Sequence, residues 1–462
     1  MIKFILNNQN IETDLPKGST VLDFVRYHKN LKGTKIGCRE GDCGACTILV
    51  GELVDDSVKY RTQTSCLMPL ANANGKHIVT VEGINKPNNE LTEVQQAMVD
   101  ESGTQCGFCT VGFVMSLTNF CIDDSAKTVD SAISAIDGNI CRCTGYKSIE
   151  RAAERICEKL SEPSAVADGL SFAIQNEIVP EYFNDIKSRL KLMSDNSELN
   201  RPLRQTVLTQ FVSGGTDLYV QKPEEMVCAD AESLFDNSAL RFINETADFV
   251  EVGASVVVTD LLESEAFGKL FPNLFKHLKL VSSTPIRNMA TLAGNFVNAS
   301  PIGDMTAWFL ALNAEIVFNS GREIALKDFY LGYKQLEKTE DEFITKIRFQ
   351  KDFTHFNFEK VCKRTYLDIA SVNTAISLKV EDSFINFAHV SAGGVSPIPL
   401  YLRETSEFLR GREINEETIV EATEIIQTEI SPISDVRGSA EYKRLLLRQL
   451  FTAHLVELFE IN

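Results

Sequence analysis

Eight of the twelve cysteines form two groups before residue 144, and their spacing constrains the fold more than any other feature. The first group combines a C-x4-C-x2-C stretch with one cysteine that follows after nineteen intervening residues: Cys38, Cys43, Cys46 and Cys66. This spacing is typical of a plant-type [2Fe–2S] site. A structural zinc site usually supplies two close pairs, so zinc and an unliganded loop are the weaker alternatives. Gly37, Gly41 and Gly44 would relieve side-chain clashes where the loop wraps around the cluster.

The second group consists of a C-x2-C pair and a C-x-C pair: Cys106, Cys109, Cys141 and Cys143. One pair begins a predicted helix and the other precedes a second helix, where free N–H groups and the helix dipole favour an anionic cluster. Two close pairs can also hold zinc, but the neighbouring site favours a second [2Fe–2S] cluster. Arg142, between two ligands, would either offset the charge of the cluster or be solvated. The remaining cysteines are expected to be apolar packing residues: Cys121, Cys157, Cys228 and Cys362.

The length of 462 residues predicts about three or four domains. The 46 basic and 64 acidic residues give a net charge of −18, which argues against binding to nucleic acid or to an anionic membrane. The N-terminal stretch lacks the pattern of a signal peptide, and no apolar run has the length of a membrane span. We therefore expect a cytoplasmic protein, whose cysteines stay reduced and serve metals, catalysis or packing.

Hydrophobic periodicity predicts a strand-rich unit followed by a helical one. Residues 1–15 have the pattern of a hairpin, Ser19 is a candidate N-cap for the helix that follows, and 77–84 alternates like a strand. Thr92 and Gln95 form a capping box at the start of four predicted helices. The loss of periodicity over 161–185 predicts a linker. Further on, 439–459 has the pattern of a long amphipathic helix.

Two glycine-containing loops are candidates for binding a phosphate-bearing cofactor, although no G-x-G-x-x-G motif is present. Gly214 and Gly215 follow the apolar stretch VLTQFV, so their backbone could approach a pyrophosphate and form an anion nest. The stretch ASPIGD supplies a second turn, in which Ser300 and Asp304 could bond a polar cofactor. Taken alone, a GG pair after a strand is most often simply a turn, and ASPIGD could equally be an ordinary loop.

The cysteine stretches GCREGDCGACT, QCGFCTVGF and GNICRCTGY resemble the iron–sulfur half of the molybdenum hydroxylases, which include xanthine dehydrogenase, aldehyde oxidoreductase and carbon monoxide dehydrogenase. VSGGTDL (212–218) and IRNMATLAGNFVNASPIGD (286–304) resemble the FAD domain of that family, and SPISDVRGSAEYKRLL (431–446) resembles its flavoprotein C-terminal domain. The resemblance implies a multidomain α+β fold with these parts: a β-grasp plant-type ferredoxin domain (1–84), a four-helix [2Fe–2S]-binding domain (85–160), a linker (161–185), a two-lobed α+β FAD-binding domain (186–349) and a small α+β C-terminal domain (350–462).

The resemblance also implies a set of FAD contacts. The pyrophosphate loop would be formed by Phe211, Val212, Ser213, Gly214, Gly215, Thr216, Asp217 and Leu218. Further contacts would come from Thr291, Asn295, Ser300, Asp304, Ile344 and Lys360. Lys360 could stabilise an anionic reduced flavin, or it could be a surface lysine. Three positions depart from the family pattern: Val111 and Ala293 replace a proline and a glycine, and Val281 stands where a phenylalanine often packs against the flavin.

The fusion of iron–sulfur and flavin parts without a molybdopterin-binding part resembles the small subunit of two-component bacterial xanthine dehydrogenases. The resemblance implies that a large partner subunit carries the molybdenum cofactor and hydroxylates a purine, in a heterodimer or a dimer of heterodimers. Electrons would then pass through the helical-domain cluster, the ferredoxin-domain cluster and FAD to NAD⁺. No residue of this chain is expected to catalyse the hydroxylation. The alternatives are the same role in a hydroxylase for aldehydes or other N-heterocycles, and a zinc-stabilised scaffold without redox function.

Overall fold

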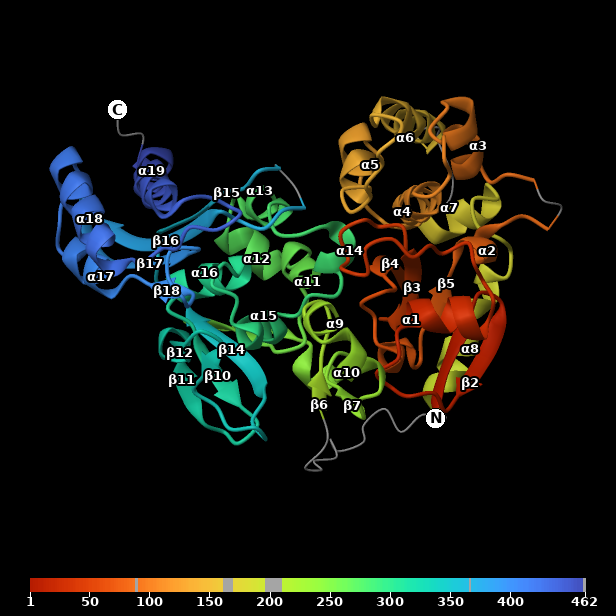
Figure 1. Cartoon of the computed structure of the whole chain (residues 1–462), viewed down its shortest axis with the longest axis horizontal. Helices are drawn as coiled ribbons and strands as arrows, with labels where there is room; N and C mark the ends of the chain where they lie inside the picture. Colours follow the sequence, from red (N-terminus) through yellow and green to blue (C-terminus); the bar gives the residue numbers. More distant parts are fainter. Residues whose placement is uncertain (88–89, 161–168, 196–209, 365–366, 460–462) are drawn as a thin grey trace. The chain divides into compact units, whose positions relative to one another are not determined.

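The computed structural model describes residues 1–87, 90–160, 169–195, 210–364 and 367–459 (Figure 1). The chain divides into two compact units. The first unit comprises Met1–Asn237 and Ser283–Met289, and the second comprises Ser238–Ser282 and Ala290–Asn462. The predicted FAD-binding domain, 186–349, is therefore divided between the two units. Among the described residues, no helix is both long and apolar enough to span a membrane.

The first unit begins with a mixed five-stranded sheet of order β2-β1-β5-β3-β4, in which only β1 and β5 run parallel. Its strands are β1 (Ile2–Leu6), β2 (Gln9–Thr13), β3 (Thr47–Val54), β4 (Ser57–Thr64) and β5 (His77–Val79). The predicted hairpin over 1–15 is confirmed by the pairing of β1 with β2. The strand expected over 77–84 is wrong in its second half, because Val81–Ile84 forms the helical turn α2.

A short helical segment packs on this sheet. It consists of α1 (Val21–Asp23) and the π-helical turn η1 (Phe24–His28). The N-cap is Thr20 rather than the expected Ser19, because the hydroxyl of Thr20 accepts a hydrogen bond from the backbone N–H of Asp23. Val21, Leu22 and Phe24 are buried in the same apolar cluster as the inner strands.

The expected helices of the next part are present in the first unit (Figure 1). They are α3 (Glu93–Asp100), α4 (Thr110–Ile122), α5 (Val129–Ala135) and α6 (Lys147–Leu160). The capping box is confirmed, since Gln95 N–H donates to the Thr92 hydroxyl while the Gln95 side chain accepts from Thr92 N–H. Within the predicted linker, 161–168 lie outside the described residues, and α7 (Gly169–Gln175) packs against α4. The second half of this segment is thus more ordered than its sequence pattern indicates.

The first unit is completed by α8 and by short elements from two parts of the chain. These are α8 (Phe183–Asp195), β6 (Gln210–Val212), α9 (Leu218–Gln221), α10 (Pro223–Val227), β7 (Ala231–Ser233) and α14 (Thr284–Arg287). Strands β6 and β7 pair in parallel. The first half of the apolar stretch VLTQFV, 207–209, lies outside the described residues.

The second unit contains an antiparallel sheet of order β11-β10-β14-β9-β8, with helices packed beside it. Its elements are η3 (Ser238–Leu240), β8 (Ile243–Glu245), β9 (Phe249–Gly253), α11 (Val258–Leu262), α12 (Glu265–Leu270), α13 (Leu274–Lys279), α15 (Leu292–Asn298), α16 (Asp304–Ala311), β10 (Glu315–Phe318), β11 (Glu323–Ala325), η4 (Leu326–Asp328), β12 (Tyr330–Gly332), β13 (Gln335–Leu336) and β14 (Ile344–Gln350). Trp308 is buried against the rings of Phe271 and Phe356 in its core.

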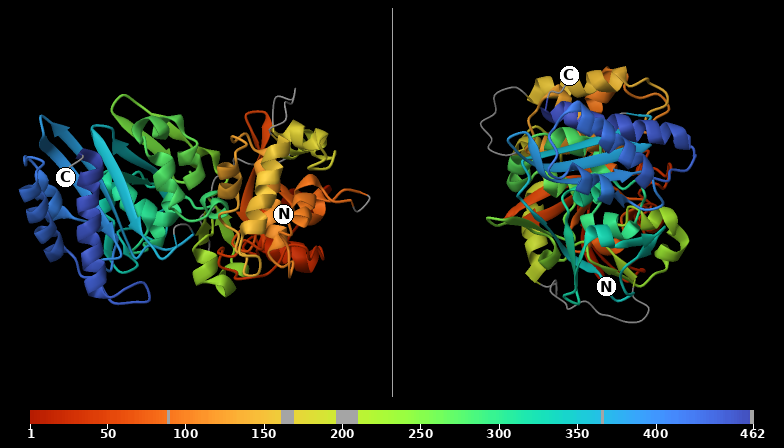
Figure 2. Two further views of the ribbon diagram at one scale, coloured as in Figure 1. Left: turned by 90° about the horizontal axis from the view of Figure 1, so that it is seen from above. Right: turned by 90° about the vertical axis from the view of Figure 1, so that its left-hand side faces the viewer.

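A second antiparallel sheet of the same unit has the order β15-β16-β17-β18. Its elements are β15 (His355–Val361), β16 (Val372–Glu381), β17 (Phe384–Gly393), β18 (Leu400–Tyr401), α17 (Arg403–Leu409), α18 (Glu416–Glu429) and α19 (Ala440–Phe459). The sheet lies between α16 and the blue helices α17–α19 (Figure 2). Alternation along β16 explains this layering, because Ile376 packs in the cluster with α19 whereas the Ser377 hydroxyl donates to Ala311 O of α16. The predicted C-terminal helix is confirmed as α19.

Candidate iron–sulfur and flavin sites

In the first cysteine group, the thiols of Cys38 and Cys43 form a close pair within the loop before β3. The backbone N–H groups of Cys38, Cys43 and Glu40 donate to the sulfurs of this pair over 3.3 to 3.4 Å. The hydrogen bond to Cys43 lowers the pKa of the Cys38 thiol to about 5, and the same contact raises the pKa of Cys43. The lowered pKa favours the thiolate form of Cys38, and the thiolate is the form that binds a metal.

Cys46 and Cys66 form the second close pair of this group, and both are buried. The hydrogen bond from Cys66 lowers the pKa of Cys46, whereas the shared contact and burial raise the pKa of Cys66. Cys66, which nineteen residues separate from Cys46, is therefore brought next to the loop.

The glycines around the first group have steric reasons to be glycines. A Cβ atom on Gly37 would lie 2.5 Å from Cys43 Sγ, and one on Gly41 would lie 2.7 Å from side-chain atoms of both Leu67 and Ile286. Gly41 and Gly44 have φ angles of +81° and +66°, in the left-handed region that favours glycine. These observations support the expectation of a tightly wrapped loop.

The second cysteine group is also arranged in two pairs. Cys106 Sγ and Cys143 Sγ lie 3.5 Å apart and are exposed, while Cys109, the N-cap residue of α4, pairs with Cys141. The hydrogen bond from the Phe108 N–H, followed by that from Cys143, lowers the pKa of the Cys106 thiol. The same contact with Cys106 raises the pKa of the Cys143 thiol. Burial raises the pKa of Cys109 to about 12.

The pKa of the Cys141 thiol is lowered. Burial alone would raise it, but the hydrogen bonds with Thr144 outweigh that effect. The Thr144 hydroxyl lies 3.1 Å from Cys141 Sγ, and the Thr144 N–H donates to the same sulfur. The donors come from the turn before α6, as the sequence predicts for a helix N-terminus. Arg142 stands between the two ligands in this turn.

The eight thiols thus form four pairs, and in each pair one pKa is lowered and the other is raised. Within the described residues, no three histidine, cysteine or acidic side chains gather as ligands of one metal ion. A cluster of two irons fits the observed pairs, because each iron of a [2Fe–2S] cluster held by four cysteines takes two protein thiolates. A single zinc ion would instead need four donors around one centre.

The predicted pyrophosphate loop, Phe211–Leu218, belongs to the first unit. Gly215 has a φ angle of +79°, and a Cβ atom there would lie 2.7 Å from Leu67 O, one residue after the ligand candidate Cys66. The hydroxyl of Ser213 is buried and has no hydrogen-bond partner among the described residues. A left-handed glycine and an unpartnered hydroxyl are features that fit a phosphate-bearing ligand at this loop.

The other predicted FAD contacts belong to the second unit. The hydroxyl of Thr291 caps α15, and Asn295 Oδ1 accepts from the backbone N–H and hydroxyl of Thr306. Ser300 accepts from the N–H of Ile302 in the turn before α16, and Ile344 is a buried residue at the start of β14. Thr291, Asn295 and Ser300 therefore hydrogen-bond to residues that lie close to them along the chain.

Asp304 and Lys360 form a buried ion pair 2.7 Å long, with 13% and 1% of their side chains exposed. Lys360 Nζ also donates to Leu280 O, which shows that it is not a surface lysine. The other oxygen of Asp304 accepts from Asn373 Nδ2 at 2.6 Å. Sequence reasoning missed Asn373, because it lies on β16, far from any recognised motif.

The departures from the family pattern have structural consequences. Val281 is 7% exposed and packs in the core of the second unit, and Ala293 packs against the same core. Val111 lies in the first turn of α4, so the helix starts without a proline. Among the remaining cysteines, Cys121 and Cys157 are buried as expected. The packing prediction is wrong for Cys228, which is exposed, and Cys362 is only partly buried.

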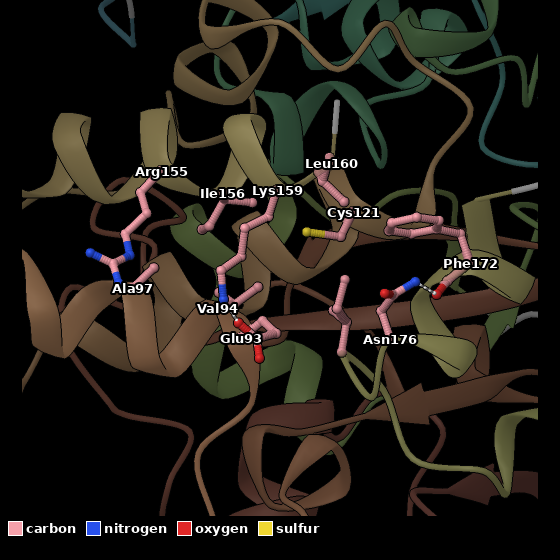
Figure 3. Close-up of a pocket in the computed structure, with 11 residues that line it drawn as sticks. Glu93, Val94, Ala97, Cys121, Arg155, Ile156, Lys159, Leu160, Phe172 and Asn176 are labelled. Carbon is pink, nitrogen blue, oxygen red and sulfur yellow. Dashed lines mark hydrogen bonds and ion pairs between the residues drawn. The ribbon is translucent and has the colours of Figure 1, made fainter. Parts of the chain in front are cut away.

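A pocket in the helical part of the first unit lies outside every predicted site (Figure 3). Its volume is about 250 Å³, and Cys121 and Phe172 contribute to its apolar lining. At its edge Lys159 is paired with Glu93, and Arg155 is paired with Asp100. The charged groups of this pocket therefore already have partners.

Four family models match this chain. They are a 2Fe-2S iron-sulfur cluster binding domain at 4–71, a [2Fe-2S] binding domain at 80–154, the FAD binding domain in molybdopterin dehydrogenase at 192–349 and the CO dehydrogenase flavoprotein C-terminal domain at 358–458. Two [2Fe–2S]-binding domains and one FAD-binding domain are therefore present. Both cysteine groups fall within the two matched iron–sulfur domains.

Similar proteins include oxidoreductases of known activity. Xanthine dehydrogenase of Emericella nidulans is 28% identical over 91% of this chain and 36% of its own length, and xanthine dehydrogenase 1 of Arabidopsis thaliana is 27% identical over 95% and 38%. Aldehyde oxidase of Homo sapiens is 24% identical over the whole chain and 39% of its own length. The chain thus spans less than two fifths of the length of these relatives.

Solved structures resemble about half of the chain. A chain of carbon monoxide dehydrogenase from Hydrogenophaga pseudoflava aligns with a TM-score of 0.52 and 23% identity, over 55% of this chain and 91% of its own. A chain of quinoline 2-oxidoreductase from Pseudomonas putida 86 aligns with a TM-score of 0.50 and 23% identity, over 54% and 89%. These likenesses show the fold of the matched half. The four matched domains, which in this order cover most of the chain, place it in the molybdenum hydroxylase family, of which it carries the iron–sulfur and flavin-binding part.

Proposed function

We propose that this chain is the electron-transfer part of a xanthine dehydrogenase-type enzyme, passing electrons from a molybdenum-cofactor subunit to NAD⁺. The observation that carries the proposal is the arrangement of eight thiols in four pairs, with the chain after Cys66 beside the predicted pyrophosphate loop. The assigned iron ligands are the two groups Cys38, Cys43, Cys46, Cys66 and Cys106, Cys109, Cys141, Cys143. The assigned FAD residues are Phe211–Leu218, Thr291, Asn295, Ser300, Asp304, Ile344 and Lys360.

The exposure of the two thiol groups supports the proposed direction of electron flow. Cys106 and Cys143 of the second group are exposed, so a partner could approach this group directly. Cys46 and Cys66 of the first group are buried, and the chain after Cys66 contacts the loop that contains Gly215. The second group is therefore suited to receive electrons and the first to deliver them towards flavin.

The cofactors differ in the number of electrons that they exchange. Iron–sulfur clusters accept and donate single electrons, NAD⁺ takes two as a hydride, and FAD can exchange one or two. The residues of this chain hold, orient and shield these groups, and the hydroxylation itself is assigned to the partner. We also propose a cytoplasmic location and the β-grasp fold for residues 1–84. The other proposed parts are the helical [2Fe–2S]-binding domain at 85–160, the linker at 161–185, the FAD-binding domain at 186–349 and the C-terminal domain at 350–462.

The acceptor can be tested without the partner subunit. We expect NADH, added anaerobically to the purified chain, to bleach the flavin absorption and then that of the iron–sulfur clusters. Dithionite serves as the control, because it reduces flavin and clusters whatever the natural acceptor is. Reduction by dithionite but not by NADH would contradict NAD⁺ as the acceptor and leave the electron-transfer role in place.

The substrate is decided by the partner. The relatives include both xanthine dehydrogenases and aldehyde oxidases, so the same role in an aldehyde or N-heterocycle hydroxylase is the second candidate. The co-purifying large subunit should be identified, and the complex assayed anaerobically with hypoxanthine, xanthine and aldehydes. Cluster reduction by a purine supports the proposal, whereas reduction by aldehydes alone favours the second candidate.

A further inference from the structure

One backbone hydrogen bond connects the two cysteine groups. The N–H of Ile140 donates to the carbonyl oxygen of Cys43 over 3.1 Å. Cys43 belongs to the first group, and Ile140 immediately precedes Cys141 of the second. The two ligand residues are therefore joined by a short run of covalent bonds and this single hydrogen bond.

The side chain of Asn139 holds the two sides of this connection together. Its Nδ2 donates to Gly44 O over 3.2 Å, and its Oδ1 accepts from the hydroxyl of Ser116 over 2.7 Å. Gly44 follows Cys43 in the first loop, whereas Ser116 lies on α4, the helix that Cys109 caps. Asn139 is 5% exposed, and both ends of its amide are hydrogen-bonded, as a buried amide requires.

Two glycines let the backbones approach each other around this amide. A Cβ atom on Gly44 would lie 2.2 Å from Gly138 O and 2.4 Å from Asn139 Nδ2. A Cβ atom on Gly112, in the first turn of α4, would lie 2.2 Å from Gly44 O. The Asn139 amide therefore lies in a space that is open only because neither glycine carries a side chain.

The opposite side of the same turn is held by a buried ion pair. Asp137 accepts hydrogen bonds from the N–H of Thr284 and from the Arg287 guanidinium, each over 2.7 Å. Arg287 and Asp137 are 6% and 5% exposed. The turn that leads into Cys141 is thus anchored on both sides, and Asn139 is the anchor that reaches the first cysteine group.

We propose that Asn139 is a positioning residue that sets the spacing between the two groups of cluster ligands by holding Ile140 N–H against Cys43 O. The inference rests on the proposed function, since it concerns residues that would hold two [2Fe–2S] clusters. It adds a role for a side chain that is itself not a ligand. The expected consequence is a defined magnetic coupling between the two clusters when both are reduced.

The test compares Asn139→Asp with a matched control. The substitution keeps the size of the side chain but replaces the amide donor by an oxygen, which faces Gly44 O and cannot donate when ionised. The control is Asn72→Asp, because Asn72 is 1% exposed and has the same bonding pattern, donating to Ser213 O and accepting from the Ser233 hydroxyl. Asn72 contacts neither side of the connection described here.

The first measurement is hydrogen exchange of the peptide that contains the Ile140 amide. We expect exchange at least about tenfold faster in Asn139→Asp than in the wild type, because a hydrogen bond worth about 1.4 kcal/mol is weakened. The control should exchange at the wild-type rate in this peptide. Equal exchange in Asn139→Asp and the wild type would overturn the inference.

The second measurement is the EPR spectrum of the fully reduced proteins, with iron and acid-labile sulfide determined in parallel. We expect the spin–spin splitting of the wild type to persist in Asn72→Asp and to be lost in Asn139→Asp at equal iron content. Splitting that is unchanged in Asn139→Asp would overturn only the inference, whereas a wild type without iron would overturn the proposed function. If Asn139→Asp does not fold, Ser116→Ala decides by the same two readouts, with smaller changes in the same direction expected.

Discussion

The Lys360–Asp304 pair is the buried charge that ties β15 to the start of α16. Removal of one partner leaves the other charge buried without compensation, which typically costs about 3–5 kcal/mol. We therefore expect Lys360→Ala to lower the free energy of unfolding of the second unit by about that amount in urea denaturation, although Asp304 keeps its bond from Asn373.

The matched control for this prediction is the Lys276–Glu457 pair, in which 58% and 44% of the side chains are exposed. Exposed pairs contribute about 0–1 kcal/mol, so Lys276→Ala should change the unfolding midpoint little. Equal effects of the two substitutions would show that burial does not determine the contribution of Lys360.

Cys66 and Cys121 are both buried, but only Cys66 belongs to a group of paired thiols. Two [2Fe–2S] clusters contain about four irons per chain, so Cys66→Ala should reduce the iron content to about two. Cys121→Ala should keep about four irons and lose only stability. Full iron content in Cys66→Ala would contradict the ligand assignment.

At this scale the sequence was most informative where function depends on spacing along the chain. The loop around Cys43 could be predicted because short ligand spacings and left-handed glycines are local constraints. The partners of Asp304 could not, since Asn373 is distant in sequence and the pairing depends on how β16 packs beside α16. The predicted burial of Cys228 is wrong for a related reason. A cysteine outside a motif does not indicate whether its side chain faces the core or the solvent.

At the scale of elements, a buried polar chain joins α13, β15 and α19. Asn357 Oδ1 lies 3.0 Å from His277 Nε2, and Asn357 Nδ2 lies 3.1 Å from His454 Nδ1. Burial lowers the pKa of His277 to about 4 and that of His454 to about 3. Both histidines are therefore neutral in the folded protein at pH 5, whereas in the unfolded chain they bind protons below about pH 6.5.

The sign of the pH dependence follows from these pKa values. The unfolded state binds more protons between about pH 3 and pH 6.5, so the second unit loses stability as the pH falls from 7 to 5. Each histidine should account for a loss on the order of 2 kcal/mol over this interval. His454→Gln should show a correspondingly smaller loss in urea unfolding curves recorded at both pH values, and an unchanged loss would contradict the prediction.

Elements with local start signals could be predicted, and those fixed by their surroundings could not. The capping box of Thr92 and Gln95 begins α3 as expected, since its hydrogen bonds lie within four residues. Within the alternating stretch 77–84, the strand β5 ends at Val79, because it pairs with β1 only at Ile5 and Leu6. Alternation alone does not encode how far a neighbouring strand extends.

At the scale of the whole molecule, the two compact units do not follow the domain boundaries that sequence motifs indicate. Ser283–Met289 belongs to the first unit, where Arg287 pairs with Asp137 and Asn288 donates to Thr62 O. This segment lies inside a match to one FAD-binding family model. Motifs report which residues are inherited together, whereas compact units depend on long-range contacts, so the division of the FAD-binding segment could not be predicted.

We expect the whole chain to hold two [2Fe–2S] clusters and one FAD for electron transfer. The most direct measurement is the content of iron, acid-labile sulfide, zinc and flavin in the purified chain, together with its EPR spectrum after reduction by dithionite. We expect a brown protein with about four irons, about four sulfides and one FAD, and with signals from two distinct clusters. A colourless protein that contains zinc, but neither sulfide nor flavin, would contradict it.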